Sequence, residues 1–241
     1  MMVSAIIPVH NEEDNVIPVY RELKEILQKV TTDFEIIFVD DGSKDATLDK
    51  LLSLKSKEEK LHIIQFKKNY GKSAALSAGF DNAEGDSIIT LDGDGQDDPN
   101  NIPNLISALT EEYDFVCGWR VKRNDTFLKK TSSKIYNFLN RVINRSKIHD
   151  NNCMLRIYRK ETVSDLKLTK GAHRYIPTIL TSKGFRIAEI EVNHRPRLTG
   201  KSSYGFKRLF VGLFHLFRFR SFNRIKQKPI YVIEKKYGFE E

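Results

Sequence analysis

Short apolar runs alternate with amphipathic stretches through the first half of the chain. The apolar runs are typical of buried strands and lie at residues 3–9, 34–39, 61–66, 87–91 and 115–118. The stretches between them repeat apolar side chains at helical spacing, at about residues 14–30, 45–57, 71–83 and 101–111. Strands that alternate with helices of this length indicate right-handed βαβ units. The pattern therefore predicts an α/β fold, with helices flanking a mostly parallel sheet.

The pattern loosens after Gly118. We expect a basic amphipathic helix, a strand, a helix and a further strand, at about residues 128–144, 154–158, 175–182 and 186–192. A polar loop at 195–205 then precedes a basic, aromatic-rich helix at 206–222. We therefore expect one domain at residues 1–205 and a basic amphipathic C-terminal segment at residues 206–241.

The composition is that of an ordinary globular protein, since 40% of the 241 residues are hydrophobic and 30% are charged. The two cysteines, Cys117 and Cys153, lack a disulfide-type spacing, which favours a reducing compartment. The N-terminus enters an apolar strand without the basic region and cleavage site of a secretory signal. No apolar run reaches the roughly 18 to 20 residues that span a bilayer. These features predict a cytoplasmic protein.

Charge is distributed unevenly along the chain. The formal net charge is +8, and basic residues concentrate at 120–145 and 195–236, whereas acidic residues gather in the first half. A basic C-terminal half suggests nucleic acid, an anionic membrane surface or phosphorylated substrates as partners. Charge alone does not choose among these.

An acidic loop follows the fourth apolar run. It reads Asp92-Gly93-Asp94-Gly95-Gln96-Asp97-Asp98-Pro99. Carboxylate and amide oxygens suit Mg²⁺ or Mn²⁺, ions that usually reach a protein together with a substrate's phosphates. An EF-hand is the sharpest rival, but Asp97 stands where that loop needs Gly and Pro103 where it needs Glu. The loop therefore indicates a substrate that carries a diphosphate.

Polar clusters also follow the first two predicted strands, at residues 11–12 and 40–41. In a parallel sheet the carboxyl ends of the strands lie at one edge, where ligands bind. We therefore expect a binding cleft there, with helix capping by Asp40 and Asp41 as the alternative. A P-loop ending in Gly71-Lys72-Ser73 is not supported, because Phe66 stands in place of its first glycine. A Rossmann dehydrogenase is disfavoured too, since no G-x-G-x-x-G follows the first strand.

Taken in order, these motifs resemble family 2 glycosyltransferases of the GT-A (Rossmann-like) fold, and especially their polyprenyl-phosphate branch. Besides the acidic loop, the motifs begin at Ile7, Val39, Asn69 and Arg197, and the match covers about residues 3–220. The chain departs from the family pattern at His10, where an aromatic residue is usual, and at Ser203, where lysine is common.

The resemblance implies inverting transfer of a sugar from a UDP- or GDP-linked donor to dolichyl or undecaprenyl phosphate, with Mg²⁺ or Mn²⁺ as cofactor. It places the donor's nucleoside near Pro8, Asn11, Glu12 and Asp40. Asp92 would lie near the ribose and diphosphate, and the metal ligands would be Asp94 and Gln96. The acceptor phosphate would meet Arg120, Arg123, Lys129 or Lys130, and Ser133. In the late loop, the motif that begins at Arg197, the side chains of Arg197, Lys201 and Ser202 would hold the diphosphate or the acceptor phosphate. The residues implied in catalysis are Asp92, Asp94, Asp150 and Arg197.

Asp150 separates two acceptor classes. An acceptor phosphate is already an anion and needs cations for positioning rather than a general base. A hydroxyl acceptor on a soluble glycan or protein would instead need a carboxylate base, and Asp150 is the candidate.

The predicted helix at 206–222 suits a membrane interface, because its phenylalanines and leucines are interrupted by lysines and arginines. We expect peripheral association with the cytoplasmic face of a membrane. Docking on the catalytic domain and a homo-oligomer contact are the alternatives. An alternative of a different functional class is a non-catalytic module that uses the basic half to bind membranes or nucleic acid. Nucleic acid is not expected, because the paired carboxylates would repel its backbone.

Overall fold

The computed structural model describes residues 1–121, 148–196 and 231–239. They form an eight-stranded sheet with the order β7-β5-β6-β4-β1-β2-β3-β8. The strands are β1 (Val3–Val9), β2 (Phe34–Asp40), β3 (Leu61–Phe66), β4 (Ser87–Thr90), β5 (Phe115–Trp119), β6 (Arg156–Arg159), β7 (Ile187–Glu191) and β8 (Ile233–Tyr237). β6 pairs antiparallel with β4 and β5, and β8 pairs antiparallel with β3, whereas the remaining pairs are parallel. The mostly parallel α/β sheet predicted from the sequence is confirmed.

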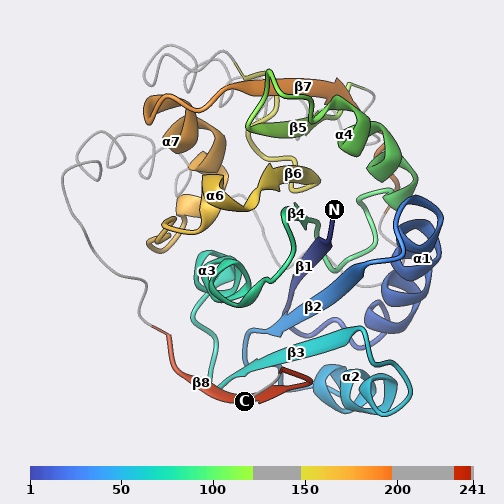
Figure 1. The fold of residues 1–241 in the computed structure, drawn as a ribbon. Helices are drawn as coiled ribbons and strands as arrows, with labels where there is room; N and C mark the ends of the chain where they lie inside the picture. Colours follow the sequence, from blue (N-terminus) through green and yellow to red (C-terminus); the bar gives the residue numbers. More distant parts are fainter. Residues whose placement is uncertain (122–147, 197–230, 240–241) are drawn as a thin grey trace.

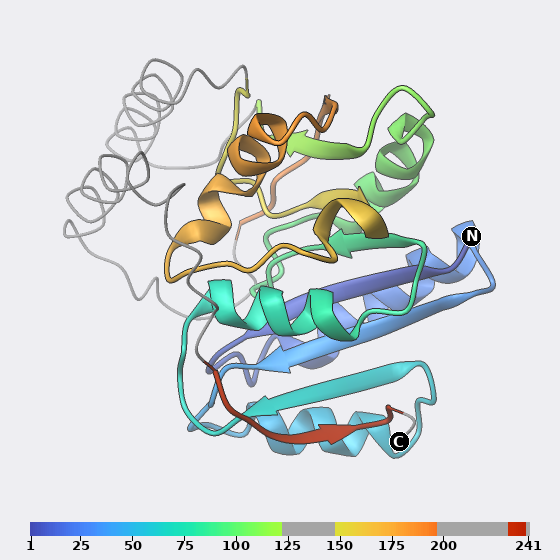
Figure 2. The ribbon, with the colours of Figure 1, turned by 60° about the vertical axis from the view of Figure 1, so that its left-hand side comes forward.

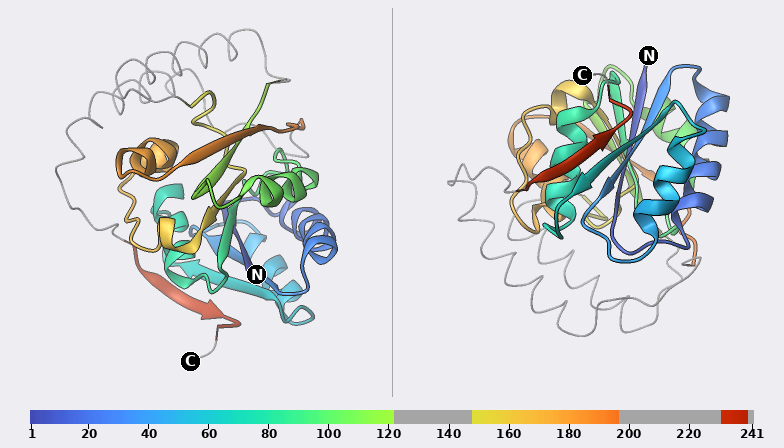
Figure 3. Two further views of the ribbon diagram at one scale, coloured as in Figure 1. Left: turned by 45° about the horizontal axis from the view of Figure 1, so that its top comes forward. Right: turned by 90° about the horizontal axis from the view of Figure 1, so that it is seen from below.

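Helices cover both faces of this sheet (Figures 1 and 3). One face carries α1 (Val16–Val30), α2 (Thr47–Lys55) and α4 (Ile102–Ala108). The other face carries α3 (Lys72–Asn82), α6 (Lys160–Val163) and α7 (Ile176–Ser182). Short 3-10 turns, Pro99–Asn101 and Ala172–Tyr175, lead into α4 and α7. The result is a three-layer arrangement, with a separate apolar cluster on each side of the sheet.

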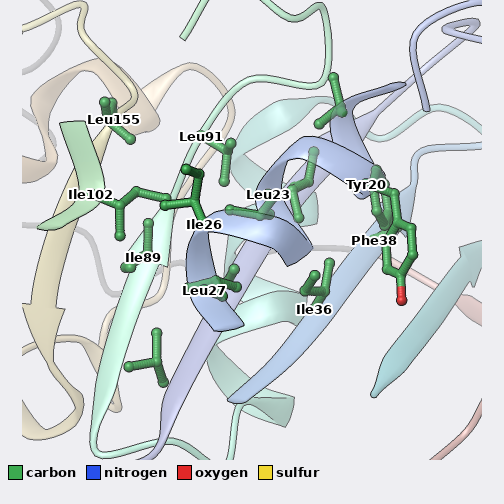
Figure 4. Close-up of a cluster of buried hydrophobic side chains, with 14 of the residues drawn as sticks. Tyr20, Leu23, Ile26, Leu27, Ile36, Phe38, Ile89, Leu91, Ile102 and Leu155 are labelled. Atoms are coloured by element: carbon green, nitrogen blue, oxygen red, sulfur yellow. The ribbon is translucent and has the colours of Figure 1, made fainter. Parts of the chain in front are cut away.

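The larger of the two clusters lies between α1 and the sheet (Figure 4). Leu23 and Leu27 are fully buried on the inner side of α1, and they pack in one cluster with Ile36 of β2 and Ile89 of β4. The spacing of four residues puts the two leucines on the same face of the helix. The apolar periodicity in the sequence thus marks the side of α1 that the sheet covers.

The strand order creates a switch point at the carboxyl edge of the sheet. β1 lies between β2 and β4 in the sheet. The connection that leaves β1 leads to β2, whereas the connection that leaves β4 leads in the opposite direction along the sheet, to β5. In open α/β sheets, ligands bind in the crevice at such a point. The loop after β1 and the acidic loop at residues 92–99 therefore meet where a binding site is expected.

Most predicted elements agree with the observed ones to within a few residues, although α4 ends earlier than expected. The sequence analysis missed β8, which extends along β3 and becomes one edge of the sheet (Figure 2). β8 lies in the predicted C-terminal segment, 206–241, so part of that segment belongs to the sheet. The helices expected at 128–144 and 206–222 lie outside the described residues. Among the helices within the described ranges, none is both long and apolar enough to cross a membrane.

Packing of α1 on the sheet can be tested with Leu23→Ala. The substitution removes a fully buried side chain, and we expect the free energy of unfolding to fall by about 2–5 kcal/mol. Gln28→Ala is the control, because Gln28 is exposed on the same helix and its loss should change stability little. Urea denaturation measures both variants. Equal stability of the two would contradict the packing described for α1.

Candidate active site

The loops after β1 and β2 are tied together by Asn11. Its backbone is in the left-handed region, with φ of 55°, a conformation that asparagine tolerates better than most residues. Its backbone N–H donates to Ser43 Oγ at 2.9 Å, and its side-chain Oδ1 accepts from the backbone N–H of Lys44 at 2.8 Å. Glu12 donates its backbone N–H to Thr47 Oγ1 at 2.8 Å in the same connection. Asn11 and Glu12 thus fix the shape of this edge.

Asp40, the last residue of β2, and Asp41, directly after it, are buried carboxylates with different partners. Asp40 accepts hydrogen bonds from the backbone N–H and the hydroxyl of Ser43. Asp41 accepts from the backbone N–H groups of Tyr70 and Gly71, at 2.6 and 2.8 Å, where α3 begins. Burial raises the pKa of both carboxyls, although these hydrogen bonds oppose it. Neither carboxylate caps α2, which was the alternative prediction for this pair.

Glycine is required at position 42 for the loops after β2 and β3 to meet. Gly42 has φ of +67°, and a Cβ there would lie 2.4 Å from the backbone carbon of Lys68. Both the conformation and the contact exclude a larger residue. Asp40 is consequently held next to the residues that follow β3.

The acidic loop after β4 is folded on itself by its own carboxylates. Asp97 Oδ2 accepts the backbone N–H of Asp92 at 2.9 Å, and Asp94 Oδ1 accepts that of Gln96 at 3.1 Å. The loop also packs on the end of β1, since a Cβ at Gly93 would lie 2.5 Å from Val9 Cγ1. Burial, together with the negative charge of Asp92, raises the pKa of Asp97 to about 7. The loop therefore concentrates negative charge with little access to water.

Lys72, at the start of α3, supplies a cation to this loop. Its Nζ lies 2.6 Å from Asp92 Oδ1. Burial alone would raise the pKa of Asp92, but the charge and the hydrogen bond of Lys72 outweigh it and hold that pKa below its usual range. In the sequence, Lys72 was part of the Asn69 motif and of the rejected P-loop, and its pairing with Asp92 was not predicted. Its position in the Asn69 motif was the available signal.

A second cation reaches the loop from the segment after β7. The Arg195 guanidinium contacts Asp98 Oδ1 at 2.5 Å and Glu22 Oε1 of α1 at 2.7 Å. The backbone N–H of Arg195 also donates to the carbonyl of Gln96 at 3.0 Å. The start of the polar loop predicted at residues 195–205 is thus anchored on the acidic loop.

Arg120 and Asp150 form a buried ion pair beside the same loop. Arg120 Nε lies 2.8 Å from Asp150 Oδ2, and Nη2 lies 3.2 Å from Oδ1. The Asp150 side chain is only 1% exposed. The charge of Arg120 adds to the lowering of the Asp92 pKa by Lys72, and it opposes the rise in the Asp97 pKa that burial causes. Trp119 stacks on His149 with ring centroids 4.3 Å apart. The chain just before residue 122 and just after residue 147 is thereby held together.

Arg156, on β6, is a fully buried arginine that the sequence analysis did not single out. Its guanidinium donates to the carbonyl of Asn151 at 2.8 Å and, over longer distances, to the carbonyl of His173 and the hydroxyl of Tyr158. Its charge lowers the pKa of Asp92. No sequence pattern distinguishes this arginine from those on the surface.

The acidic loop offers oxygen atoms of the right kind for a divalent metal. Within the described ranges, no three Asp, Glu, His or Cys side chains gather into a complete protein metal site. Asp94 and Gln96 instead offer a carboxylate and a carboxamide oxygen in one turn. Mg²⁺ is commonly held by one or two carboxylates together with substrate phosphates, so the residues fit a metal that binds with a diphosphate.

The remaining predicted residues divide into two groups. Pro8 is buried within β1, one residue before its end. Outside the described residues lie Arg123, Lys129, Lys130, Ser133, Arg197, Lys201 and Ser202.

Comparison with known families identifies the family to which this chain belongs. Residues 4–167 match the family described as Glycosyl transferase family 2. The chain belongs to this family. It is therefore a glycosyltransferase, and the resemblance stated from the motifs is confirmed.

Two curated relatives resemble this glycosyltransferase over most of its length. The dodecaprenyl-phosphate galacturonate synthase of Rhizobium johnstonii is 38% identical over 231 residues, which cover 94% of this chain and 68% of the relative. The undecaprenyl-phosphate 4-deoxy-4-formamido-L-arabinose transferase of Aeromonas hydrophila is 34% identical over 216 residues, covering 89% of this chain and 66% of the relative. The chain thus spans about two thirds of the length of these relatives.

Solved structures share the fold at low sequence identity. Glucosyl-3-phosphoglycerate synthase from Mycobacterium tuberculosis, in complex with Mn²⁺, UDP and phosphoglyceric acid, is similar with a TM-score of 0.70 and 15% identity. The match covers 91% of this chain and 78% of that one. Mannosyl-3-phosphoglycerate synthase from Rubrobacter xylanophilus gives 0.71 at 17% identity, covering 94% and 76%. The GT-A-like α/β fold of the glycosyltransferase is confirmed.

Measurements of stability distinguish an ion-pair role of Asp150 from a general-base role. Asp150→Asn leaves the Arg120 charge buried without its carboxylate, and we expect the free energy of unfolding to fall by about 3–5 kcal/mol. Asp114→Asn is the control, because the Asp114–Arg186 pair is far more exposed and its loss should cost much less. Chemical denaturation measures both. An Asp150→Asn glycosyltransferase that is inactive yet as stable as the wild type would favour the base.

Proposed function

We propose that this glycosyltransferase transfers a sugar from a UDP- or GDP-linked donor to a polyprenyl phosphate. The observation that carries the proposal is the similarity to relatives whose names specify dodecaprenyl and undecaprenyl phosphate, at 38% and 34% identity. The acidic loop at the switch point supports it, because a metal–diphosphate site is what a nucleotide-sugar donor needs.

In this proposal the donor lies along the carboxyl edge of β1, β2 and β4. Pro8, Asn11, Glu12 and Asp40 border the nucleoside, and Asp92 lies near the ribose and the diphosphate. Asp94 and Gln96 hold Mg²⁺ or Mn²⁺, as the fold relative from M. tuberculosis was crystallised with Mn²⁺ and UDP. When bound, the metal neutralises charge on the leaving diphosphate.

Cationic side chains of the protein supply the remaining electrostatic stabilisation. An oxygen of the acceptor phosphate attacks the anomeric carbon, and the bond from that carbon to the diphosphate breaks with its electron pair. The configuration at that carbon inverts. Lys72, 2.6 Å from Asp92, stands where charge on the departing diphosphate can be stabilised.

The acceptor phosphate is proposed to bind on the side of Arg120. Arginine suits this role because its guanidinium can grip two phosphate oxygens at once. Asp150 then orients Arg120 through the two contacts described above. Further proposed partners lie outside the described residues: Arg123, Lys129 or Lys130, and Ser133 for the acceptor phosphate, and Arg197, Lys201 and Ser202 for the diphosphate or the acceptor phosphate.

We further propose that the protein works at the cytoplasmic face of a membrane, where a polyprenyl phosphate would be embedded. Residues 1–205 would form the catalytic domain, and the basic, aromatic-rich stretch in 206–241 would contact the membrane surface. An acceptor hydroxyl on a soluble glycan or a protein is the second candidate. It is disfavoured because Arg120 engages both carboxylate oxygens of Asp150.

Transfer of labelled sugar into an organic-extractable lipid tests the proposal. With undecaprenyl phosphate and a suitable UDP- or GDP-sugar, Asp94→Ala should lower the rate about 100-fold or more, because a metal ligand is lost. Asp165→Ala is the matched control, since Asp165 is exposed just beyond α6. Equal transfer by Asp94→Ala and the wild type would refute the metal assignment. Wild-type transfer only to soluble acceptors would refute the lipid assignment.

A further inference from the structure

A cavity of about 450 Å³ opens at the carboxyl ends of β2 and β3. Its lining comes from the loops after β1, β2 and β3, including His10 and Asp40, and from Glu234 of β8. The volume lies in the range of ligand-binding pockets. The cavity includes Asp40, which the proposed function assigns to the donor's nucleoside. A residue near the end of the chain therefore lines the same cavity.

Irregular pairing between β3 and β8 brings Glu234 to this place. Gln65 pairs with Lys235 and Phe66 pairs with Ile233, so Glu234 is left over between two consecutive partners on β3. Such a bulge changes the direction of a side chain, and bulges are over-represented next to active sites. The extra residue lies beside Gln65 and Phe66, which also line the cavity.

β8 lies along β3 (Figure 2), and contacts on both sides of the bulge hold it in position. The backbone N–H of Lys67 donates to the carbonyl of Val232 at 3.2 Å, and Tyr231 stacks on Phe66 with ring centroids 5.1 Å apart. Further along, Tyr237 donates its hydroxyl hydrogen to Gln65 Oε1 at 3.0 Å. β8 is thus a built part of the cavity wall.

Asp40 and Glu234 both line the cavity, but their carboxylates differ in their hydrogen-bond partners. Lys44, Lys67 and Lys68 line it together with Asp40 and Glu234. The Asp40 carboxylate accepts hydrogen bonds from Ser43, whereas Glu234 has no hydrogen-bond or ion-pair partner among the described residues. An exposed carboxylate without a partner, on the lining of a cavity, is available to accept hydrogen bonds from a ligand.

We propose that Glu234 of the C-terminal strand β8 is a donor-binding residue that accepts N–H or O–H groups of the nucleoside. The inference rests on the proposed function, because the cavity must hold a nucleotide. The hydrogens come either from the base or from the ribose hydroxyls. In either case the C-terminal strand completes the donor site from outside residues 1–205.

Calorimetric titration of the full chain with UDP and with GDP, in the presence of Mn²⁺, tests the inference. The nucleotide that the wild type binds should bind Glu234→Ala about 10-fold more weakly, because a charge-assisted hydrogen bond is lost. The affinity of Glu234→Gln should lie between those of the wild type and Glu234→Ala, since glutamine keeps an acceptor oxygen. Glu191→Ala makes the same charge change at an exposed residue of β7, at the opposite edge of the sheet, and should bind as the wild type does.

The outcomes separate the inference from the function on which it rests. Circular dichroism first establishes that each variant is folded. If Glu234→Ala binds as tightly as Glu191→Ala, the inference is wrong and the proposed function stands. If the wild type binds neither nucleotide, the proposed function itself fails. Repeating the titration with 2′,3′-dideoxy nucleotides assigns the contact, because the effect of Glu234→Ala disappears if its partners are ribose hydroxyls and persists if they lie on the base.

Discussion

The neutralisation of buried carboxylates at one edge of the sheet is the constraint on which this structure depends. Asp92, Asp94, Asp97 and Asp98 lie within one loop, and three of them are less than a tenth exposed. Burying charge without compensation is costly. Cations therefore reach the loop from separate parts of the fold: Lys72 from α3, Arg195 from the segment after β7, and Arg120 from the end of β5.

This constraint links the loop's chemistry to the topology of the sheet. β4 lies next to β1, so the loop packs on the end of β1 and needs Gly93 at the contact. A diphosphate and its metal can take over part of this charge balance when a donor binds. In the proposed reaction, the cations that hold the loop also stand ready to stabilise the leaving group. In this proposal, the same electrostatic arrangement serves both folding and catalysis.

The sequence predicted the fold best where the pattern is local. Periodicity identified the buried face of α1 and the strands up to β5, and the motifs placed Asp40 and the acidic loop at one edge. Neither the periodicity nor the motifs predicted β8, because this short edge strand carries charged residues and is mostly exposed, so it has no apolar pattern. The pairs Lys72–Asp92 and Arg120–Asp150 join residues 20 and 30 positions apart. Such contacts depend on how strands are ordered in space, which local periodicity does not specify.

The proposed function requires the acidic loop to form the metal–diphosphate site of a glycosyltransferase. Anomalous diffraction from crystals grown with Mn²⁺ and the nucleoside diphosphate that the protein binds tests it directly. We predict one strong manganese peak between the oxygens of Asp94 and Gln96 and the two phosphates of the nucleotide. A nucleotide bound elsewhere on the molecule, or a manganese peak away from this loop, would contradict the account.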